Sequence, residues 1–419
     1  MPGSPSTSPA SFIDELATFR DAFAISDPDL IYLDGNSLGR LPKATLESLA
    51  QVVSQEWGEG LIRGWNLNWY AAASRIGDKI APLLGAASGQ VVVTDTTSIN
   101  LYKLAMAALA RLPERKKIVT DELNFPSDLY ILQSCINQLG EGYTLQLVRS
   151  HDGMTIALDD LAGAVDEDTA LVSLSHVAFK SGFMYDAEQV TRLAHQAGAL
   201  MLWDICHAVG AVPLELDAWG ADLSVGCTYK YLNGGPGAPA FLYVRRDLQD
   251  ELQQPIWGWF AERQPFAFEL DFTPAQGMRR FLVSSPPILS TLAMEAALDI
   301  VLQAGIERIR RKSIAQTSYL IELFDTRLVQ LGFKLGTPRN PTLRGSHVSI
   351  RHPEGYRINR ALIDEMKVIP DFREPDNIRL GIAPLYTSFD EIHEAVERIC
   401  QVVTEKRYLK YPLQRQAVT

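Results

Sequence analysis

The chain has 419 residues, which exceeds what one ordinary hydrophobic core accommodates, so we expect two domains. Its residues are 47% hydrophobic and 21% charged, as in soluble globular proteins, and its formal net charge of -11 disfavours nucleic acid and anionic membranes as partners. No apolar run approaches the ~20 residues that a membrane-spanning helix needs.

The N-terminal start, MPGSPSTSPA, lacks the basic and apolar regions of a signal peptide, and we expect it to be a frayed terminus. Further along, apolar β-rich segments predict strands buried on both faces of a sheet. These segments are 91–94, 117–120, 170–176, 199–204, 222–228 and 238–244. Helical spacing between them predicts helices over 98–110, 126–139 and 186–197. The alternation indicates an α/β domain with a mostly parallel sheet.

After Pro286 the pattern changes. A long helix ending at Gly305 is followed by a second helix over 306–331, short strands near 346–351 and 377–382, and an amphipathic helix that starts near Ser388. We interpret this part as a smaller α+β domain, onto which the N-terminal segment packs. The predicted organisation is therefore a segment over 1–42, a large domain over 43–305 and a small domain over 306–419.

The cysteines and histidines argue against disulfides and structural metals. Cys135, Cys206, Cys227 and Cys400 are scattered without a CxxC pair, which favours reduced thiols and a cytoplasmic location. The seven histidines form no HExxH motif, so no metal is expected.

Polar side chains follow the carboxyl ends of the predicted parallel strands, where open α/β sheets bind ligands. We expect these clusters to converge in one crevice. They are Thr96, Thr97 and Ser98; Asn124, Phe125, Ser127 and Asp128; Ser175 and His176; Asp204 and His207; and Thr228, Tyr229 and Lys230.

Two of these residues indicate a pyridine cofactor with an aldehyde group. Asp204 ends an apolar strand, and a buried carboxylate needs a partner such as a protonated ring nitrogen. Lys230 follows the next apolar run, where its amine can form an imine and later act as a base. Hydroxyl groups at the start of the helix near Ser98 suit a phosphate, and Phe125 can cover a flat ring. Each residue alone is more often a cap, turn or core residue, so the hypothesis depends on their combination.

Longer motifs extend this pattern along the chain. They are IYLDGNSLG (31–39), LNFPSD (123–128), LWDICHAVG (202–210), YKYLNGGPG (229–237), GWF (258–260), PPIL (286–289) and IRLGIAPLYTSF (378–389). Together they resemble kynureninases, pyridoxal 5'-phosphate (PLP) enzymes of fold type I in the aminotransferase class V group. The resemblance implies the fold-type I architecture and hydrolysis of the β–γ carbon bond of L-kynurenine to anthranilate and L-alanine, in tryptophan catabolism or NAD biosynthesis.

The resemblance also implies roles for individual residues. Lys230 forms the Schiff base with PLP, Asp204 pairs with the ring nitrogen, and Tyr229 contacts the phosphate and donates a proton. The remaining cofactor contacts are Thr97, Ser98, Phe125, Asp128, Ser175, His207 and Ser285, together with Trp259, which reaches the phosphate of the neighbouring subunit and implies a homodimer. The implied substrate contacts are Arg379 at the carboxylate and Ser37 and Trp65 near the aromatic end.

Two positions depart from animal kynureninases that favour 3-hydroxykynurenine, which carry His and Asn where this chain has Trp65 and Ser285. The bacterial pattern here implies a preference for L-kynurenine. The alternative is another class V enzyme, a cysteine desulfurase or an aminotransferase. A desulfurase needs a reactive cysteine on a mobile loop, whereas Cys206 and Cys227 lie beside or within predicted strands. A non-catalytic α/β protein with a degenerate site is a further alternative, which the intact polar set disfavours.

Overall fold

The computed structural model describes residues 12–412 and residue 414, so the predicted frayed terminus lies outside the described residues. Its main sheet has the strand order β2-β8-β7-β6-β5-β3-β4 within that range. The strands are β2 (Val91–Val93), β3 (Lys117–Asp121), β4 (Thr144–Val148), β5 (Thr169–Ser175), β6 (Leu200–Asp204), β7 (Leu223–Gly226) and β8 (Phe241–Val244). The pairs from β4 to β7 are parallel, and β8 runs antiparallel to β2 and β7.

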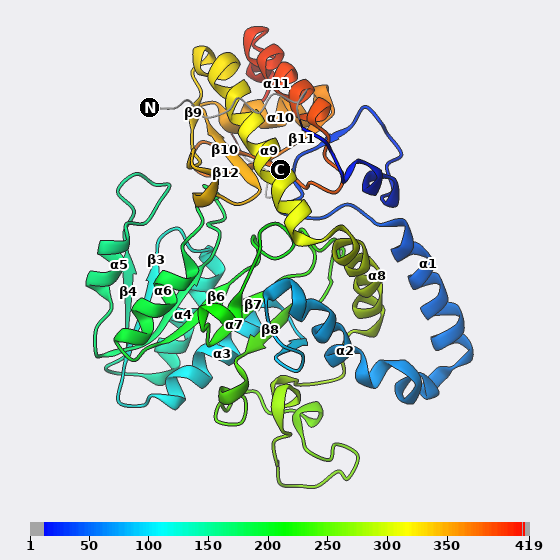
Figure 1. Ribbon diagram of the computed structural model, residues 1–419, viewed down its shortest axis with the longest axis vertical. Helices are drawn as coiled ribbons and strands as arrows, with labels where there is room; N and C mark the ends of the chain where they lie inside the picture. The colour runs from blue at the N-terminus through cyan, green and yellow to red at the C-terminus, as the bar shows by residue number, and fades with distance from the viewer. Residues whose placement is uncertain (1–11, 413, 415–419) are drawn as a thin grey trace.

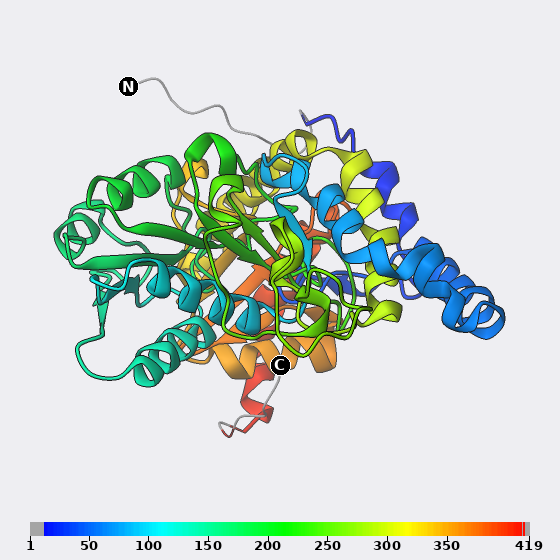
Figure 2. The same cartoon turned by 90° about the horizontal axis from the view of Figure 1, so that it is seen from below.

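Helices cover both faces of this sheet (Figures 1 and 2). They are α3 (Thr97–Arg111), α4 (Pro126–Leu139), α5 (Leu158–Ala164), α6 (Ala187–Gln196) and α7 (Leu216–Trp219). Because successive strand residues point to opposite faces, Leu202 packs in one apolar cluster with α3 and α4, while Met201 and Trp203 pack in another with α6. The central strands β5, β6 and β7 are therefore buried on both faces and are mostly apolar, as the sequence predicts.

The second sheet is smaller and antiparallel, in the order β12-β13-β10-β9. Its strands are β9 (Lys334–Leu335), β10 (His347–Arg351), β12 (Asp371–Arg373) and β13 (Asn377–Gly381). Residues of α9 (Ile306–Leu323), α10 (Gly355–Met366) and α11 (Phe389–Thr404) form one apolar cluster with it. Ser388 caps α11 in a capping box with Glu391, as its predicted starting position requires.

The N-terminal part of the described chain lies against this smaller unit. Strand β1 (Ile31–Tyr32) pairs in parallel with β11 (Val368–Ile369), and the Arg20 guanidinium forms an ion pair of 2.8 Å with Glu391. The helices α1 (Lys43–Gln51) and α2 (Tyr70–Ile80) then lead into the main sheet along α8 (Ile288–Ala304) (Figure 1). The loop between β1 and α1 is thereby held beside the segment that follows β7, where the Gly39 N–H donates to the Tyr229 carbonyl.

Among the described residues, no single helix has the length and apolar character needed to cross a membrane. The segments 288–304 and 306–331 meet that criterion only together, by length and composition, and the break between them bends the pair by 78°.

Candidate active site

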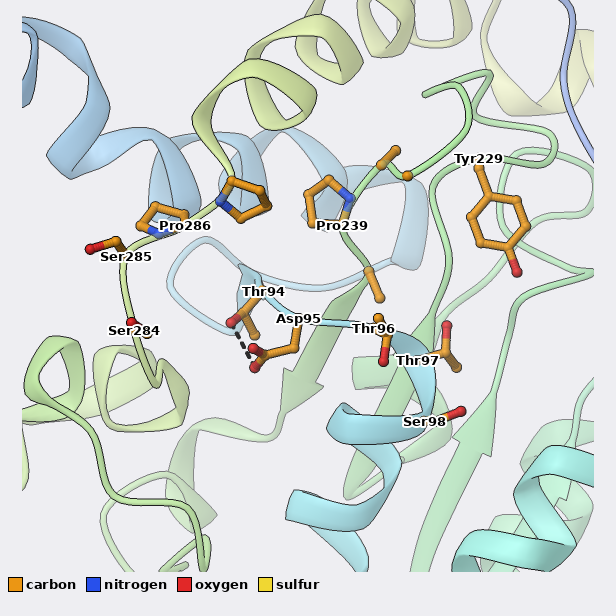
Figure 3. Close-up of a pocket in the computed structure, with 14 residues that line it drawn as sticks. Thr94, Asp95, Thr96, Thr97, Ser98, Tyr229, Pro239, Ser284, Ser285 and Pro286 are labelled. Atoms are coloured by element: carbon orange, nitrogen blue, oxygen red, sulfur yellow. Dashed lines mark hydrogen bonds between the residues drawn. The ribbon is translucent and has the colours of Figure 1, made fainter.

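The carboxyl ends of the parallel strands open into a cavity of about 200 Å³. Its lining brings together residues from the strand ends, the 34–39 loop and the small sheet. These residues are Asn36, Ser37, Thr97, Ser98, Phe125, Ser127, Asp128, Asp204, Cys206, His207, Tyr229, Lys230, Arg373 and Arg379. An adjoining cavity of about 530 Å³ shares Thr97, Ser98 and Tyr229 (Figure 3).

Two buried carboxyl groups meet at the floor of the smaller cavity. Asp204 ends β6, where its Oδ1 accepts the Cys206 N–H at 2.7 Å and its Oδ2 accepts the Ser175 hydroxyl at 3.4 Å. Burial and the negative charge of Asp204 raise the pKa of Asp128 well above its usual value. Asp128 Oδ2 has no hydrogen-bond partner among the described residues. Such a pair needs a proton or a cation beside it, and the protonated ring nitrogen of PLP fits that requirement.

The Lys230 amine lies in the same cavity, 3.1 Å from His207 Nε2. Burial and the positive charge of Lys230 lower the pKa of His207 well below its usual value, so the imidazole is neutral. The 34–39 loop crosses directly over the lysine, because the Gly39 N–H donates to the Tyr229 carbonyl at 2.8 Å. A Cβ atom at Gly39 would overlap the Lys230 carbonyl oxygen, which explains the glycine in the GNSLG motif.

The N-terminus of α3 forms a polar wall between the two cavities. Thr96 caps this helix by accepting the Ile99 N–H at 3.4 Å, and the hydroxyl groups of Ser98 and Ser127 lie 2.9 Å apart. Figure 3 shows Thr97, Ser98 and Tyr229 on one side and Ser284 and Ser285 on the other. Hydroxyl groups beside the free N–H groups of a helix start suit a phosphate dianion.

A buried lysine that sequence reasoning missed supports this wall from behind. Lys103 has a fully buried side chain, and its Nζ lies 2.7 Å from Asp95 Oδ2 and 2.6 Å from the Phe281 carbonyl oxygen. Asp95 has a φ of 47° and directly precedes the cap residue Thr96. Lysine in an apolar helix pattern usually points to solvent, so only the fold reveals this contact.

Arg379 lies on the opposite side of the cavity, on β13. Its Nη1 donates to the Phe179 carbonyl at 2.6 Å, its Nη2 donates to the Ser37 hydroxyl at 2.9 Å, and it forms an ion pair with Asp371. Arg373 also lines the cavity and pairs with Asp371 at 2.8 Å. Sequence reasoning missed Asp371, Arg373 and Asn36.

The other predicted site residues lie around this cavity or apart from it. Phe125 lines it and packs edge-on against Phe179, with 5.2 Å between the ring centroids, while Ser175 lies behind Asp204. Trp65 packs against Phe260 with 5.7 Å between the ring centroids, and Trp259 packs edge-on against the same ring at 4.4 Å. Both tryptophans lie outside the described lining of the two cavities.

The expectation that every polar cluster converges in one crevice is wrong for His176. This histidine follows Ser175 in extended chain, so the two side chains point to opposite faces of the sheet. It lines a separate cavity with Trp219 and Arg310. Thr228 is also absent from the described lining, because its hydroxyl donates to the Pro239 carbonyl at 2.6 Å.

Cys206 lines the cavity, but it is poorly suited to act as a nucleophile. Its thiol is buried and lies 3.7 Å from the Thr97 hydroxyl. A hydrogen bond to Cys227 and burial raise its pKa well above the usual value, so it stays protonated. This environment differs from the exposed reactive cysteine that a desulfurase needs.

Comparisons with known proteins agree with these features. The model of the kynureninase C-terminal domain matches residues 309–399. The kynureninase of Pseudomonas fluorescens is 46% identical over 412 residues, covering 97% of each chain, and that of Burkholderia pseudomallei (strain 1106a) is 46% identical over 395 residues, covering 93% of each.

Among solved structures, the apo cysteine desulfurase from Thermococcus onnurineus NA1 superposes with a TM-score of 0.80 at 19% identity, covering 93% of this chain and 98% of that one. The cysteine desulfurase CsdA from Escherichia coli gives 0.78 at 17% identity, covering 95% and 99%. These likenesses concern the fold, and they confirm the predicted fold-type I α/β architecture, with a mostly parallel central sheet and a smaller α+β part.

Proposed function

The chain belongs to the kynureninase family, and we infer from this that it is a PLP-dependent hydrolase that cleaves the β–γ carbon–carbon bond of L-kynurenine to anthranilate and L-alanine. One observation supports this activity at the site: the Lys230 amine, the Asp204 carboxylate and the Arg379 guanidinium line the same cavity. Bound PLP supplies an electron sink for negative charge that develops beside the substrate amine.

Three side chains hold the cofactor end in this proposal. Asp204, supported by Ser175 and the Cys206 N–H, holds the ring nitrogen protonated. Thr97 and Ser98 bind the phosphate with the N–H groups of the α3 start. The polar groups are already in place at the strand ends, so binding requires little reorganisation.

Proton transfer is assigned to Lys230 and Tyr229. The Lys230 amine serves as the base at the substrate α-carbon, and the neutral His207 beside it does not add a second positive charge. The neighbouring Cys227 and burial raise the pKa of Tyr229 above its usual value. The phenol therefore keeps its proton at neutral pH and can donate it. Arg379 and Ser37 bind the substrate at the far side of the cavity.

A homodimer is also proposed. Trp257 is 62% exposed and Phe268 is 75% exposed. Both belong to the segment 253–276, which projects from the lower edge of the molecule in Figure 1. Large aromatic side chains that are exposed close together on one segment favour a surface that binds another protein. Trp259, in the same segment, is assigned to the cofactor phosphate of the partner subunit. Light scattering of the purified enzyme tests the dimer, and a monomer at working concentration would exclude it.

Three finer assignments complete the proposal. Trp65 and Ser285 favour L-kynurenine over its 3-hydroxy form, because an indole offers less to a ring hydroxyl than an imidazole and an amide would. The four free cysteines support a cytoplasmic location. Residues 43–305 are assigned to a PLP-binding domain and 306–419 to a small domain with which the segment 1–42 packs.

Anthranilate fluorescence during incubation with L-kynurenine and PLP tests the activity. Lys230→Ala should abolish both the fluorescence and the visible absorbance of the bound cofactor, and unchanged absorbance would exclude Lys230 as the anchor. Conversion of the cofactor to pyridoxamine phosphate would instead indicate an aminotransferase, and sulfur release from cysteine would indicate a desulfurase.

A further inference from the structure

A buried carboxylate lies behind the substrate end of the cavity. Asp371 on β12 and Arg379 on β13 are directly opposite each other in the antiparallel register, and both are buried. Arg379 and Arg373 line the cavity, whereas Asp371 is absent from its described lining. The acid is therefore placed to act on the two arginines and not on a ligand.

The contacts of Asp371 fix the orientation of these arginines. Its Oδ2 accepts the Arg373 Nη2 at 2.8 Å and the Ser37 hydroxyl at 2.8 Å, and it also forms an ion pair with the Arg379 Nη2. Its Oδ1 accepts the Arg379 Nε at 3.3 Å. Because the Phe179 carbonyl holds the remaining edge of Arg379, that guanidinium has a single orientation.

The charge balance of this cluster favours an anionic ligand. Asp371 compensates only one of the two arginines that it contacts. Asp34 compensates the other arginine only in part, because burial and the charge of Asp371 raise the pKa of Asp34 to about 7. The Arg373 side chain is 36% exposed, so its guanidinium is accessible from the cavity. A surplus of positive charge thus faces the space where the substrate binds.

We propose that Asp371 is a positioning residue that directs both Arg379 and Arg373 at the carboxylate of the amino-acid substrate, and that Arg373 is a second cation of that subsite. This inference rests on the proposed function. The alternative is that Asp371 has a structural role alone and only joins β12 to β13 through its ion pair with Arg379. Buried ion pairs contribute little net stability, so stability alone is a weak reason for this arrangement.

The test compares two ligands of the holoenzyme that differ by one carboxylate. L-alanine and ethylamine both carry an amine, and binding of each is followed by the change in the visible absorbance of the cofactor. Arg373→Gln and Asp371→Asn should each weaken L-alanine binding by about tenfold or more, the effect of losing a charge-assisted hydrogen bond, and leave ethylamine binding unchanged. Arg373→Lys, which keeps the charge but loses the fork, should recover part of the loss.

Asp376→Asn is the matched control, because it removes an acid from the turn that joins β12 to β13, where Asp376 pairs with Arg351 at 3.0 Å outside the cavity lining that the structure describes. It should bind both ligands as the wild type does. Equal weakening of L-alanine and ethylamine in the Asp371 and Arg373 variants would overturn the proposal. If Asp371→Asn does not fold, Arg373→Gln alone decides, and an unchanged preference for L-alanine overturns it. Because no cleavage is measured, failure of the kynureninase activity would not be mistaken for failure of this inference.

Discussion

A buried histidine near the site makes the stability of the protein depend on pH. His347 begins β10, and neither of its ring nitrogens has a hydrogen-bond partner among residues 12–412 and 414. Burial and the positive charges of Arg379 and Lys230 lower its pKa from 6.5 to about 3. The folded protein thus keeps His347 neutral, while the unfolded chain binds a proton below about pH 6.5. The folded protein is therefore not destabilised by His347 above about pH 6.5, and its free energy of unfolding decreases progressively as the pH falls from there towards 3.

The magnitude follows from proton linkage. Between pH 7 and pH 5 the unfolded state gains ~2 kcal/mol from protonating this residue, since one pKa unit corresponds to ~1.4 kcal/mol. Leucine cannot bind a proton, so His347→Leu removes this contribution. Between pH 7 and pH 5 the variant should therefore lose ~2 kcal/mol less of its free energy of unfolding than the wild type loses. At pH 7 the substitution should cost little, because the ring nitrogens that it removes are unsatisfied.

Urea unfolding of the apoprotein at both pH values, followed by tryptophan fluorescence, measures this difference, provided that the m-value is the same. His151→Leu is the control, because the same substitution is made at a side chain that is 79% exposed, where solvent screens its ion pair with Asp160. It should retain the wild-type pH dependence. An equal loss of stability in His347→Leu and in the wild type would refute the reasoning.

Three other predictions concern the site and one concerns the fold. Asp204→Ala should lower kcat by about a hundredfold or more at modest cost in the urea midpoint, and near-normal turnover would exclude its role at the ring nitrogen. Lys103→Met should lower the free energy of unfolding by ~2 kcal/mol, because it removes a charge-assisted hydrogen bond to Asp95, and it should weaken retention of PLP on dialysis. Unchanged stability and retention would argue against the support given to the α3 start. The Trp65 assignment predicts a higher kcat/KM for L-kynurenine than for 3-hydroxykynurenine, and equal values would contradict it. Ser388→Ala should lower the free energy of unfolding by ~1 kcal/mol, measured against the conservative Ser388→Thr, because it removes the capping box of α11.

The sequence predicts most of the main sheet because its central strands are buried on both faces and read as continuous apolar runs. It does not predict β4, whose burial alternates along TLQLV, because an edge strand of mixed polarity resembles a loop. The helices α1 and α2 are also absent from the prediction. In α1 the apolar side chain of Leu46 is exposed and Thr45 is buried, which obscures the amphipathic pattern of that helix.

Open α/β sheets bind ligands at the carboxyl ends of their parallel strands, and this rule selects Asp204, Tyr229 and Lys230 from the sequence alone. The same rule has no information about Arg373, which reaches the cavity from a separate antiparallel sheet, or about Asp371, which lies behind the arginines on that sheet. The contacts of Lys103 depend on a positive-φ residue and on a loop far along the chain. Long-range tertiary contacts of this kind leave no local pattern in the sequence.

The parallel pairing of β1 with β11 has a consequence for biosynthesis. Residues 31–32 leave the ribosome early, while their partners at 368–369 emerge close to the end of translation. Ile31 and Leu33 are buried in the finished protein, in an apolar cluster whose other residues begin at Tyr319 and are therefore made late. The nascent chain therefore exposes an apolar strand for most of its synthesis, and chaperones have their longest opportunity to bind at this N-terminal segment.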